Sequence, residues 1–593
     1  MVTGWMEGSV TISARRALPR GVLFVVAAIG LTSCHRMDRA VGKEIRQAVA
    51  SPTRPASLER TRWKVVQQLY HDRKFRPIWI SDGKPKDDIR RLIATLCGSE
   101  RDGLRPADYH LAALKPVIRR AYPPIEEPTP AALAALDLQL TARFVNYGVD
   151  LLVGRLAPAS VDSGWFIKAR HSSADSLIRA AAGAKGFDAM MALMRPKRAD
   201  YDKLVTALAN YRKIQQNGGW PSIPAGVLKR GAQGRAVAAV RRRLEISGDL
   251  PASAGATVVF DAELAGAIAR FQRRHGIQVD SMIGGPTLAT LDTPVDYWIR
   301  QIEINLERYR WLPPGFGSRY VLVNIPDYHL YAFDGGKSVL DMRVIVGDEY
   351  GNATPVFADS MSYIVFHPQW YLPRRIVIDE ILPQVEQNAS YLADHGFEVV
   401  GARAPAKVLD PDTIDWEKVD TAHLGFHVRQ KSGANNPLGR VKFMFPNQFS
   451  VYLHDTPSGW LFDQARRTLS HGCVRVEHPA ELADFALAGQ DGWTDSLVRA
   501  AMVQRDTLAR RTGTADSTEV EQVTVPLEKK VPVYILYLTA YVRDGVLNFR
   551  GDPYGKDAQA QSRLPPSRPE ESSVCAEVLR ALLLDAHTSN FDR

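Results

Sequence analysis

A histidine and a cysteine that stand 19 residues apart have the side chains needed for acyl transfer. Cys473 lies in the segment SHGCVRVEHP, and His454 ends the preceding stretch FSVYLH. A thiol is a good nucleophile only as the thiolate, and an imidazole within reach can take its proton or stabilise the charged form. The pair therefore indicates a Cys–His acyl transferase or hydrolase.

Residues beside this pair are suited to supporting such a reaction. Gly472 lets the backbone approach a substrate closely, and its N–H with that of the following cysteine could hold an oxyanion. Asp455 offers a carbonyl or carboxylate that could accept the second imidazole N–H and fix the tautomer. Arg475 adds positive potential, which lowers a thiol pKa or binds a substrate carboxylate. Ser470 and His471 are interpreted as residues that orient the cysteine loop.

Strands are predicted to position these residues. From Arg319 the stretches RYVLVNI, YHLYAF and RVIVG carry β-branched and aromatic residues between turn signals, and 449–454 and 522–542 continue the pattern. Residues 374–430 are richer in helical pattern, which indicates an insertion into the β-domain. Trp370 and Tyr371 precede it, and the sequence leaves open whether they line a groove or pack in the core.

The remaining chain is predicted to be mostly helical. Apolar residues at helical spacing indicate a helical domain over 58–220, and three short amphipathic helices form a compact module over 228–292. A helix over 293–316 links this module to the β-domain of 317–550. Residues 551–593 are expected to form a flexible tail, with a Pro- and Ser-rich disordered stretch over 555–571 and a short apolar helix over 574–586. The fold class expected is multi-domain α+β.

Charge and cysteine content limit the partners. The net charge of +10 favours anionic partners, but no Lys/Arg tract with interleaved aromatics occurs, so nucleic acid is not expected. The cysteines match no zinc pattern, and no metal or cofactor is expected. Scattered cysteines in so long a chain do not predict a disulfide framework. Cys97 and Cys575 lie in helical patterns and are expected to be inert.

The N-terminus has the pattern of an export signal. Arg15, Arg16 and Arg20 precede an apolar run over 21–31 that is too short to span a bilayer. The run ends in Leu-Thr-Ser-Cys34, which resembles the lipobox of bacterial lipoproteins, where the cysteine is lipidated and becomes the new N-terminus. The alternative is ordinary cleavage nearby. Residues 1–34 are then the signal and 35–57 a polar tether.

The spacing H-(15 residues)-S-H-G-C-x-R resembles the signature of YkuD-type L,D-transpeptidases. The segments 367–376, 435–447 and 460–467 are similar to the same family, and 228–292 resembles a three-helix peptidoglycan-binding domain. The domain order resembles the large Gram-negative members, whose mostly-β catalytic domain carries an inserted helical capping subdomain. Here 374–430 matches that subdomain.

The resemblance implies a periplasmic enzyme that acts on peptidoglycan tetrapeptide stems as donor and acceptor. Cys473 would be the acylated nucleophile and His454 the base, with release of D-alanine and formation of 3→3 diaminopimelate cross-links. Trp370, Tyr371 and Arg475 are candidate substrate-binding residues. Two alternatives stay open, namely an L,D-carboxypeptidase on the same scaffold and a non-catalytic wall-binding protein. An intact His454/Cys473 pair argues against the latter.

Overall fold

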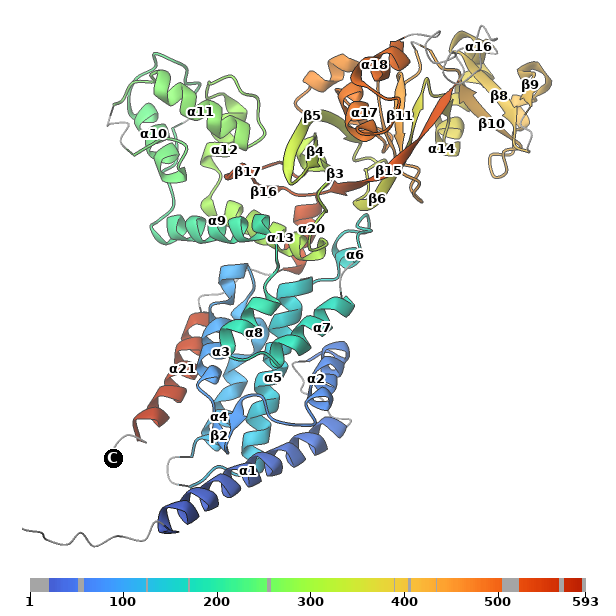
Figure 1. The fold of residues 1–593 in the computed structure, drawn as a ribbon. Helices are drawn as coiled ribbons and strands as arrows, with labels where there is room; N and C mark the ends of the chain where they lie inside the picture. The colour runs from blue at the N-terminus through green and yellow to red at the C-terminus, as the bar shows by residue number, and fades with distance from the viewer. Residues whose placement is uncertain are drawn as a thin grey trace, which may run out of the picture.

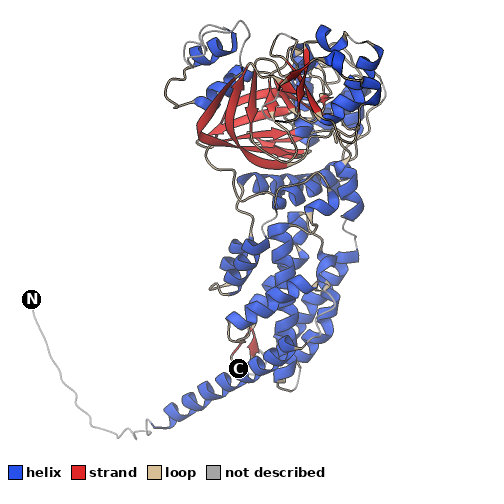
Figure 2. Ribbon diagram, turned by 90° about the vertical axis from the view of Figure 1, so that its right-hand side faces the viewer, coloured by secondary structure: helices blue, strands red, loops and turns tan. Residues whose placement is uncertain are grey.

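The computed structural model has a column of helices below a β-rich head (Figure 1). It describes residues 21–51, 58–123, 126–168, 171–224, 226–252, 257–388, 390–403, 407–433, 435–503, 522–564 and 570–588. Turned by 90°, the same view separates the helical column from the sheet above it (Figure 2). The large hydrophobic core runs through both the column and the head, so the two are packed as one body.

The column is built around α5, whose sequence favours a helix from its first residue. Pro130 occupies the first helical position, and the Thr129 hydroxyl caps the helix by accepting the Ala132 N–H at 3.2 Å. The helix is buried on most sides along its length, as expected for a central helix. The helices of the column are α2 (Arg60–Asp72), α3 (Asp88–Cys97), α4 (Lys115–Ala121), α5 (Pro130–Val153), α6 (Pro158–Val161), α7 (His171–Ala182), α8 (Phe187–Met194) and α9 (Ala199–Gln216).

The predicted polar tether is largely a packed helix. Helix α1 (Gly21–Ala50) continues to residue 50, and Val41, Ile45 and Val49 recur every four residues and are buried against the column. The tether prediction is therefore wrong for this part, because an apolar stripe lies among its charged residues. The signal residues 1–20, the side chain of Cys34 and residues 52–57 lie outside what the structure describes. No helix in the described ranges is long and apolar enough to cross a membrane.

The three-helix module has a hydrophobic core of its own. It contains α10 (Arg235–Ser247), α11 (Ala262–Arg274) and α12 (Gly285–Asp292), and the Asp261 carboxylate caps α11 by accepting the Leu264 N–H at 2.9 Å. The next helix, α13 (Val295–Trp311), is buried on nearly all sides. It approaches the column closely at Gly154, where a Cβ would lie 2.6 Å from the Glu307 carboxylate. The linker helix is thus a core element.

Nine strands among the described residues form one sheet, in the order β13-β5-β14-β12-β11-β6-β15-β3-β4, and pairing of β4 with β5 closes it. β-branched and aromatic residues supply its buried positions. The strands are β3 (Tyr320–Asn324), β4 (His329–Asp334), β5 (Lys337–Gly347), β6 (Phe357–Phe366), β11 (Val441–Met444), β12 (Leu453–His454), β13 (Thr468–Ser470), β14 (Val474–Val476) and β15 (Val523–Leu536). Helices α17 (Pro479–Leu487) and α18 (Asp495–Val503) pack on it.

The insertion is a mixed subdomain with a separate core rather than a helical one. Its sheet has the order β7-β10-β8-β9. The strands are β7 (Trp370–Tyr371), β8 (Phe397–Gly401), β9 (Val408–Leu409) and β10 (Phe426–Gln430), and the helices are α14 (Arg374–Ile376), the π-helical turn η5 (Val377–Ile381), α15 (Leu382–Gln387) and α16 (Tyr391–Asp394). The segment's VV and FHV stretches supply the strands, which the helical pattern of 374–395 obscured.

The prediction of disorder over 555–571 is wrong for 556–563, which is helical, whereas the helix predicted over 574–586 is present within a longer helix. A hairpin of β16 (Ala540–Arg543) and β17 (Val546–Phe549) leads to α20 (Lys556–Arg563), whose first residues are buried. Helix α21 (Glu570–Thr588) then lies against α3 and α4 of the column (Figure 1). A disulfide joins Cys97 of α3 to Cys575 of α21. The prediction that these two cysteines are inert is therefore wrong. Composition hid these contacts because their partners lie hundreds of residues away.

We expect reduction of this disulfide to loosen α21. Replacing both cysteines by serine should lower the free energy of unfolding by about 2–4 kcal/mol, since the cross-link restricts a very long loop in the unfolded chain. Thermal unfolding of the C97S/C575S variant, compared with the oxidised wild type, measures the effect. Equal melting temperatures with and without reductant in the wild type would contradict this expectation.

Candidate active site

Strand register places the candidate nucleophile and base on the same face of the sheet. β12 and β14 are parallel, with Leu453 opposite Val474 and His454 opposite Arg475. Leu453 and Val474 point into the core. Because side chains alternate along a strand and opposite residues share a face, His454, Arg475 and Cys473 project from the other side of the sheet. The pairing of these two strands thus places the two residues on one face.

Two further residues of this face were not singled out from the sequence. Tyr452 lies two residues before His454, and their rings are 5.7 Å apart. Lys442 of β11 is opposite His454, and its Nζ lies 5.7 Å from the centre of the Tyr452 ring. The alternation in VYLH and VKFM could have located both, since residues two apart on a strand share a face.

The cysteine loop is held by its own backbone and by Ser470. The Ser470 hydroxyl accepts the Gly472 N–H at 3.2 Å and donates to the Cys473 carbonyl at 2.5 Å. Gly472 has φ of +110°, which disfavours a side chain at this turn. Ser470 therefore bonds to both residues of the turn, and the Gly472 N–H is already used and is a poor oxyanion donor. The Cys473 N–H makes no hydrogen bond with another described residue.

The imidazole of His454 is fixed by a backbone carbonyl. Its Nδ1 lies 2.6 Å from the carbonyl oxygen of Asp455, so in the neutral ring Nδ1 carries the proton and Nε2 the lone pair. The Asp455 carboxylate instead accepts the N–H groups of Arg440 and Thr456 at 2.8 and 2.7 Å. Of the two possibilities for Asp455, the carbonyl is the one used.

Burial keeps both reacting groups neutral in the free protein. It raises the pKa of Cys473 to about 11, against the opposing effects of Tyr452 and of the positive charge of Arg475. Burial, followed by the charge of Arg475, lowers the pKa of His454 to about 3. The thiol donates to the Ser450 carbonyl, with Sγ 3.6 Å away. The resting pair is thus a neutral thiol and a neutral imidazole.

Two cations flank the thiol without a carboxylate partner among the described residues. Arg475 is half-buried, and its Nε has no hydrogen-bond partner there. The Lys442 ammonium donates to the Gln369 carbonyl at 3.5 Å, and burial lowers the pKa of Lys442. The positive potential at this face favours a thiolate during reaction and an anionic substrate group beside it.

The alkylation rate of Cys473 should depend on pH up to an unusually high value. Only the thiolate reacts, so below a pKa of about 11 the rate in the free protein should rise about tenfold per pH unit from pH 7. Replacing Arg475 by Met should slow alkylation at pH 9, because one favourable charge is lost. Short iodoacetamide pulses with peptide mass spectrometry measure the rate, and Arg242→Met, on the exposed side of α10, is the matched control. A plateau near pH 8 would instead indicate a thiolate–imidazolium pair.

The insertion reaches the site through a few polar contacts. His471 is exposed, and its Nε2 lies 2.8 Å from Oε1 of Glu380 in the π-helical turn, so it links the cysteine loop to the insertion. Trp370 is half-buried and close enough to Tyr452 to affect the pKa of its phenol. Tyr371 is exposed, and Arg429 donates to its hydroxyl at 3.4 Å. Trp370 therefore adjoins the site, whereas the phenol of Tyr371 faces the insertion's own sheet.

A large cleft among the described residues lies away from this site. It has a volume of about 1640 Å³ and lies between the three-helix module, the outer side of β4 and β5, and the β16–β17 hairpin. Its eight arginines face seven carboxylates, and most of them are paired. Neither Cys473 nor His454 lines it, so the candidate site rests on the chemistry of the residues and not on cavity size.

Comparison with known proteins identifies the domains. Residues 318–506 match the family model of the YkuD L,D-transpeptidase catalytic domain, 233–291 match one described as "Putative peptidoglycan binding domain", and 64–208 match a scaffold domain. The chain therefore carries a catalytic domain of the YkuD L,D-transpeptidase family, joined to a peptidoglycan-binding domain and a helical scaffold.

One curated relative, named "Putative L,D-transpeptidase", is from Haemophilus influenzae. It is 32% identical over 260 residues, which are 44% of this chain and 48% of the relative, so the chain matches about half the relative's length.

Two solved structures were also found. One is an L,D-transpeptidase from Xylanimonas cellulosilytica, at 14% identity and a TM-score of 0.15, with 53% of this chain and 99% of that chain covered. The other is a fused Zn-dependent amidase/peptidase/peptidoglycan-binding protein from Clostridium acetobutylicum, at 12% identity and a TM-score of 0.14, with 53% and 100% covered. Likeness at these TM-scores adds nothing to the assignment.

Proposed function

We propose that the protein is an L,D-transpeptidase that forms 3→3 cross-links between peptidoglycan stem peptides. The observation that carries the proposal is the common face shared by Cys473, His454 and Arg475 within a segment that matches the catalytic domain of this family. The adjoining peptidoglycan-binding domain supports a wall polymer as the substrate.

The first half-reaction forms a thioester. The sulfur of Cys473 attacks the carbonyl carbon of the third residue, diaminopimelate, of a donor tetrapeptide, and Nε2 of His454 takes the thiol proton. The Cys473 N–H, which has no partner among the described residues, donates to the developing oxyanion. The bond to D-alanine then breaks, and the imidazolium returns the proton to the departing amine.

The second half-reaction transfers the acyl group. The side-chain amine of diaminopimelate on an acceptor stem attacks the thioester, a new amide bond forms, and the proton lost by the amine passes through His454 to the leaving sulfur. Arg475 and Lys442 lack carboxylate partners within the described ranges, so they suit the carboxylates of the stem peptide. Trp370 is placed to pack against the donor stem beside Tyr452.

Incubation of the protein with purified tetrapeptide muropeptides tests the function. Separation of the products by mass spectrometry should give cross-linked dimers and free D-alanine in equal amounts. Trimmed tripeptides without dimers would support the alternative, an L,D-carboxypeptidase, in which water reaches the thioester before an amine. The insertion touches the cysteine loop through Glu380 and His471, and a cover that limits water favours the transferase.

The cellular location is also a proposal. The basic and apolar pattern of the N-terminus indicates export, and the Cys97–Cys575 disulfide is of the kind that persists in an oxidising compartment such as the periplasm. Attachment of lipid at Cys34 would tether the enzyme to a membrane. Mass analysis of the N-terminal peptide from the native host distinguishes a lipidated Cys34 from simple cleavage.

A further inference from the structure

The cysteine loop rests on a second loop, which joins β5 to β6. Thr354 lies at the end of this loop, and its hydroxyl accepts the Gly347 N–H at 2.9 Å and donates to the carbonyl of Gly472 at 2.8 Å. Gly472 immediately precedes the nucleophile. Gly347 has no space for a side chain, because a Cβ there would lie 1.9 Å from the Asn352 carbonyl oxygen. The conformation of this loop therefore fixes the position of Thr354, and through it the position of Gly472.

Tyr554, from the C-terminal region, holds the two ends of this loop together. Its hydroxyl donates to the Gly347 carbonyl at 2.6 Å and accepts the Thr354 N–H at 3.3 Å. The Tyr554 hydroxyl is thus hydrogen-bonded to both Gly347 and Thr354. The route from Tyr554 to the nucleophile consists of two hydrogen-bonded steps, first to Thr354 and then to Gly472.

Tyr554 is itself fixed by a buried polar network. Its N–H donates to the hydroxyl of Tyr537 at 3.0 Å, the two rings are stacked 5.7 Å apart, and Tyr537 donates to Asp552 at 2.5 Å. The Asp552 carboxylate also accepts backbone N–H groups at the start of α20. Such a network has no freedom to let the phenol move independently.

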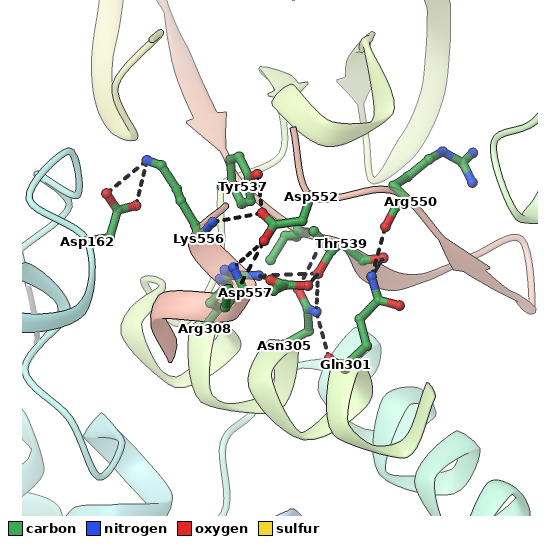
Figure 3. Close-up of polar contacts among 12 residues, drawn as sticks. Asp162, Gln301, Asn305, Arg308, Tyr537, Thr539, Arg550, Asp552, Lys556 and Asp557 are labelled. Atoms are coloured by element: carbon green, nitrogen blue, oxygen red, sulfur yellow. Dashed lines mark hydrogen bonds and ion pairs between the residues drawn. The ribbon is translucent and has the colours of Figure 1, made fainter. Parts of the chain in front are cut away.

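The same network reaches the scaffold and the linker helix (Figure 3). Lys556 of α20 forms a buried ion pair with Asp162 of the scaffold, with Nζ 2.8 and 2.7 Å from the two carboxylate oxygens. Asp557 is paired with Arg308 of α13 at 2.5 Å. The residues that hold the segment around Tyr554 therefore lie on the scaffold, on α13 and on α20, and α20 is their common point of contact.

We propose that Tyr554 is a positioning residue for the nucleophile, acting through Thr354 on the carbonyl of Gly472. The inference rests on the proposed function for its catalytic meaning, but the position of Cys473 can be measured without turnover. The hydroxyl sets the angle at which the thiol faces His454 and Arg475, and the ring only fills space against Tyr537.

The test is Tyr554→Phe, which removes the hydroxyl and keeps the stacked ring. Loss of hydrogen bonds that orient a loop should lower kcat for D-alanine release about five- to tenfold with KM within about twofold of the wild type. The rate of Cys473 alkylation by iodoacetamide at pH 9 should fall by a similar factor. The pH dependence of this rate should shift to higher pH. Peptide mass spectrometry assigns the modified cysteine.

Tyr541→Phe is the matched control. It removes a buried phenol from the neighbouring hairpin, where Tyr541 interacts with Asp327 and not with the loop that joins β5 to β6. Its alkylation profile should be that of the wild type. An unchanged profile in Tyr554→Phe, or an equal change in Tyr541→Phe, would overturn the proposal.

Thr354 supplies an independent check. Thr354→Ser keeps the hydroxyl and should react like the wild type, whereas Thr354→Val should lose as much as Tyr554→Phe. The double variant should lose no more than either single one, because both interrupt the same route. Additive losses would refute the route. If the wild type forms no cross-links but alkylation still responds to Tyr554→Phe, the proposed function fails and the positioning role stands.

Discussion

Replacement of Cys473 by alanine should abolish product formation, with a loss of at least about a thousandfold. Cys473 shares a face with His454, and the described part of the chain has no other free thiol. Mass spectrometry of tetrapeptide muropeptides after incubation measures both dimers and trimmed stems. Both should vanish, because either outcome passes through the same thioester.

Two controls make this result specific. Cys34 is neither part of the disulfide nor the proposed nucleophile, so the Cys34→Ala variant should retain activity. A melting temperature of Cys473→Ala close to that of the wild type excludes unfolding as the cause. By family resemblance a carbapenem should add its mass once to the wild type and not to Cys473→Ala. Normal dimer yield from Cys473→Ala would remove the nucleophile assignment.

Replacement of His454 by glutamine should reduce turnover by about 10²- to 10⁴-fold, the range expected for loss of a general base. Because the thiol is neutral below a pKa of about 11, attack at pH 7 requires a group that takes its proton. The loss should shrink as pH rises toward 11, since hydroxide then forms the thiolate without help. Initial rates of D-alanine release between pH 7 and 10 measure this convergence.

The matched control is His478→Gln. His478 is an exposed histidine five residues after Cys473, and its Nε2 lies 3.7 Å from a carboxylate oxygen of Glu477. Its replacement should change the rate by less than about twofold. A loss in His454→Gln that stays constant across the whole pH range would show that the imidazole acts by placement and not by proton transfer.

The face that carries Cys473 and His454 was largely predictable because it depends on local patterns. The alternation of FSVYLH put His454 at the end of a strand, and the glycine before Cys473 indicated a turn. The matched segment 318–506 agrees with the family that the His–Cys spacing suggested. What spacing could not give was the protonation state, since the burial that keeps thiol and imidazole neutral comes from the packed sheet and insertion.

Long-range contacts were the part that sequence reasoning missed. Nothing near Tyr554 in the chain indicates that its hydroxyl will reach Gly347, more than 200 residues earlier. The polar composition after residue 551 favoured disorder, yet Lys556 and Asp557 are buried because they find partners on the scaffold and on α13. Local composition does not predict that a charged residue is buried when its ion-pair partner lies far away in the sequence.

The bond between Cys97 and Cys575 spans 478 residues of sequence. The helical column therefore acquires this covalent closure only after α21 has been synthesised and has packed against α3. Until then the column depends on its noncovalent packing alone. A variant truncated before Cys575 would carry the β-sheet on a column that lacks this cross-link.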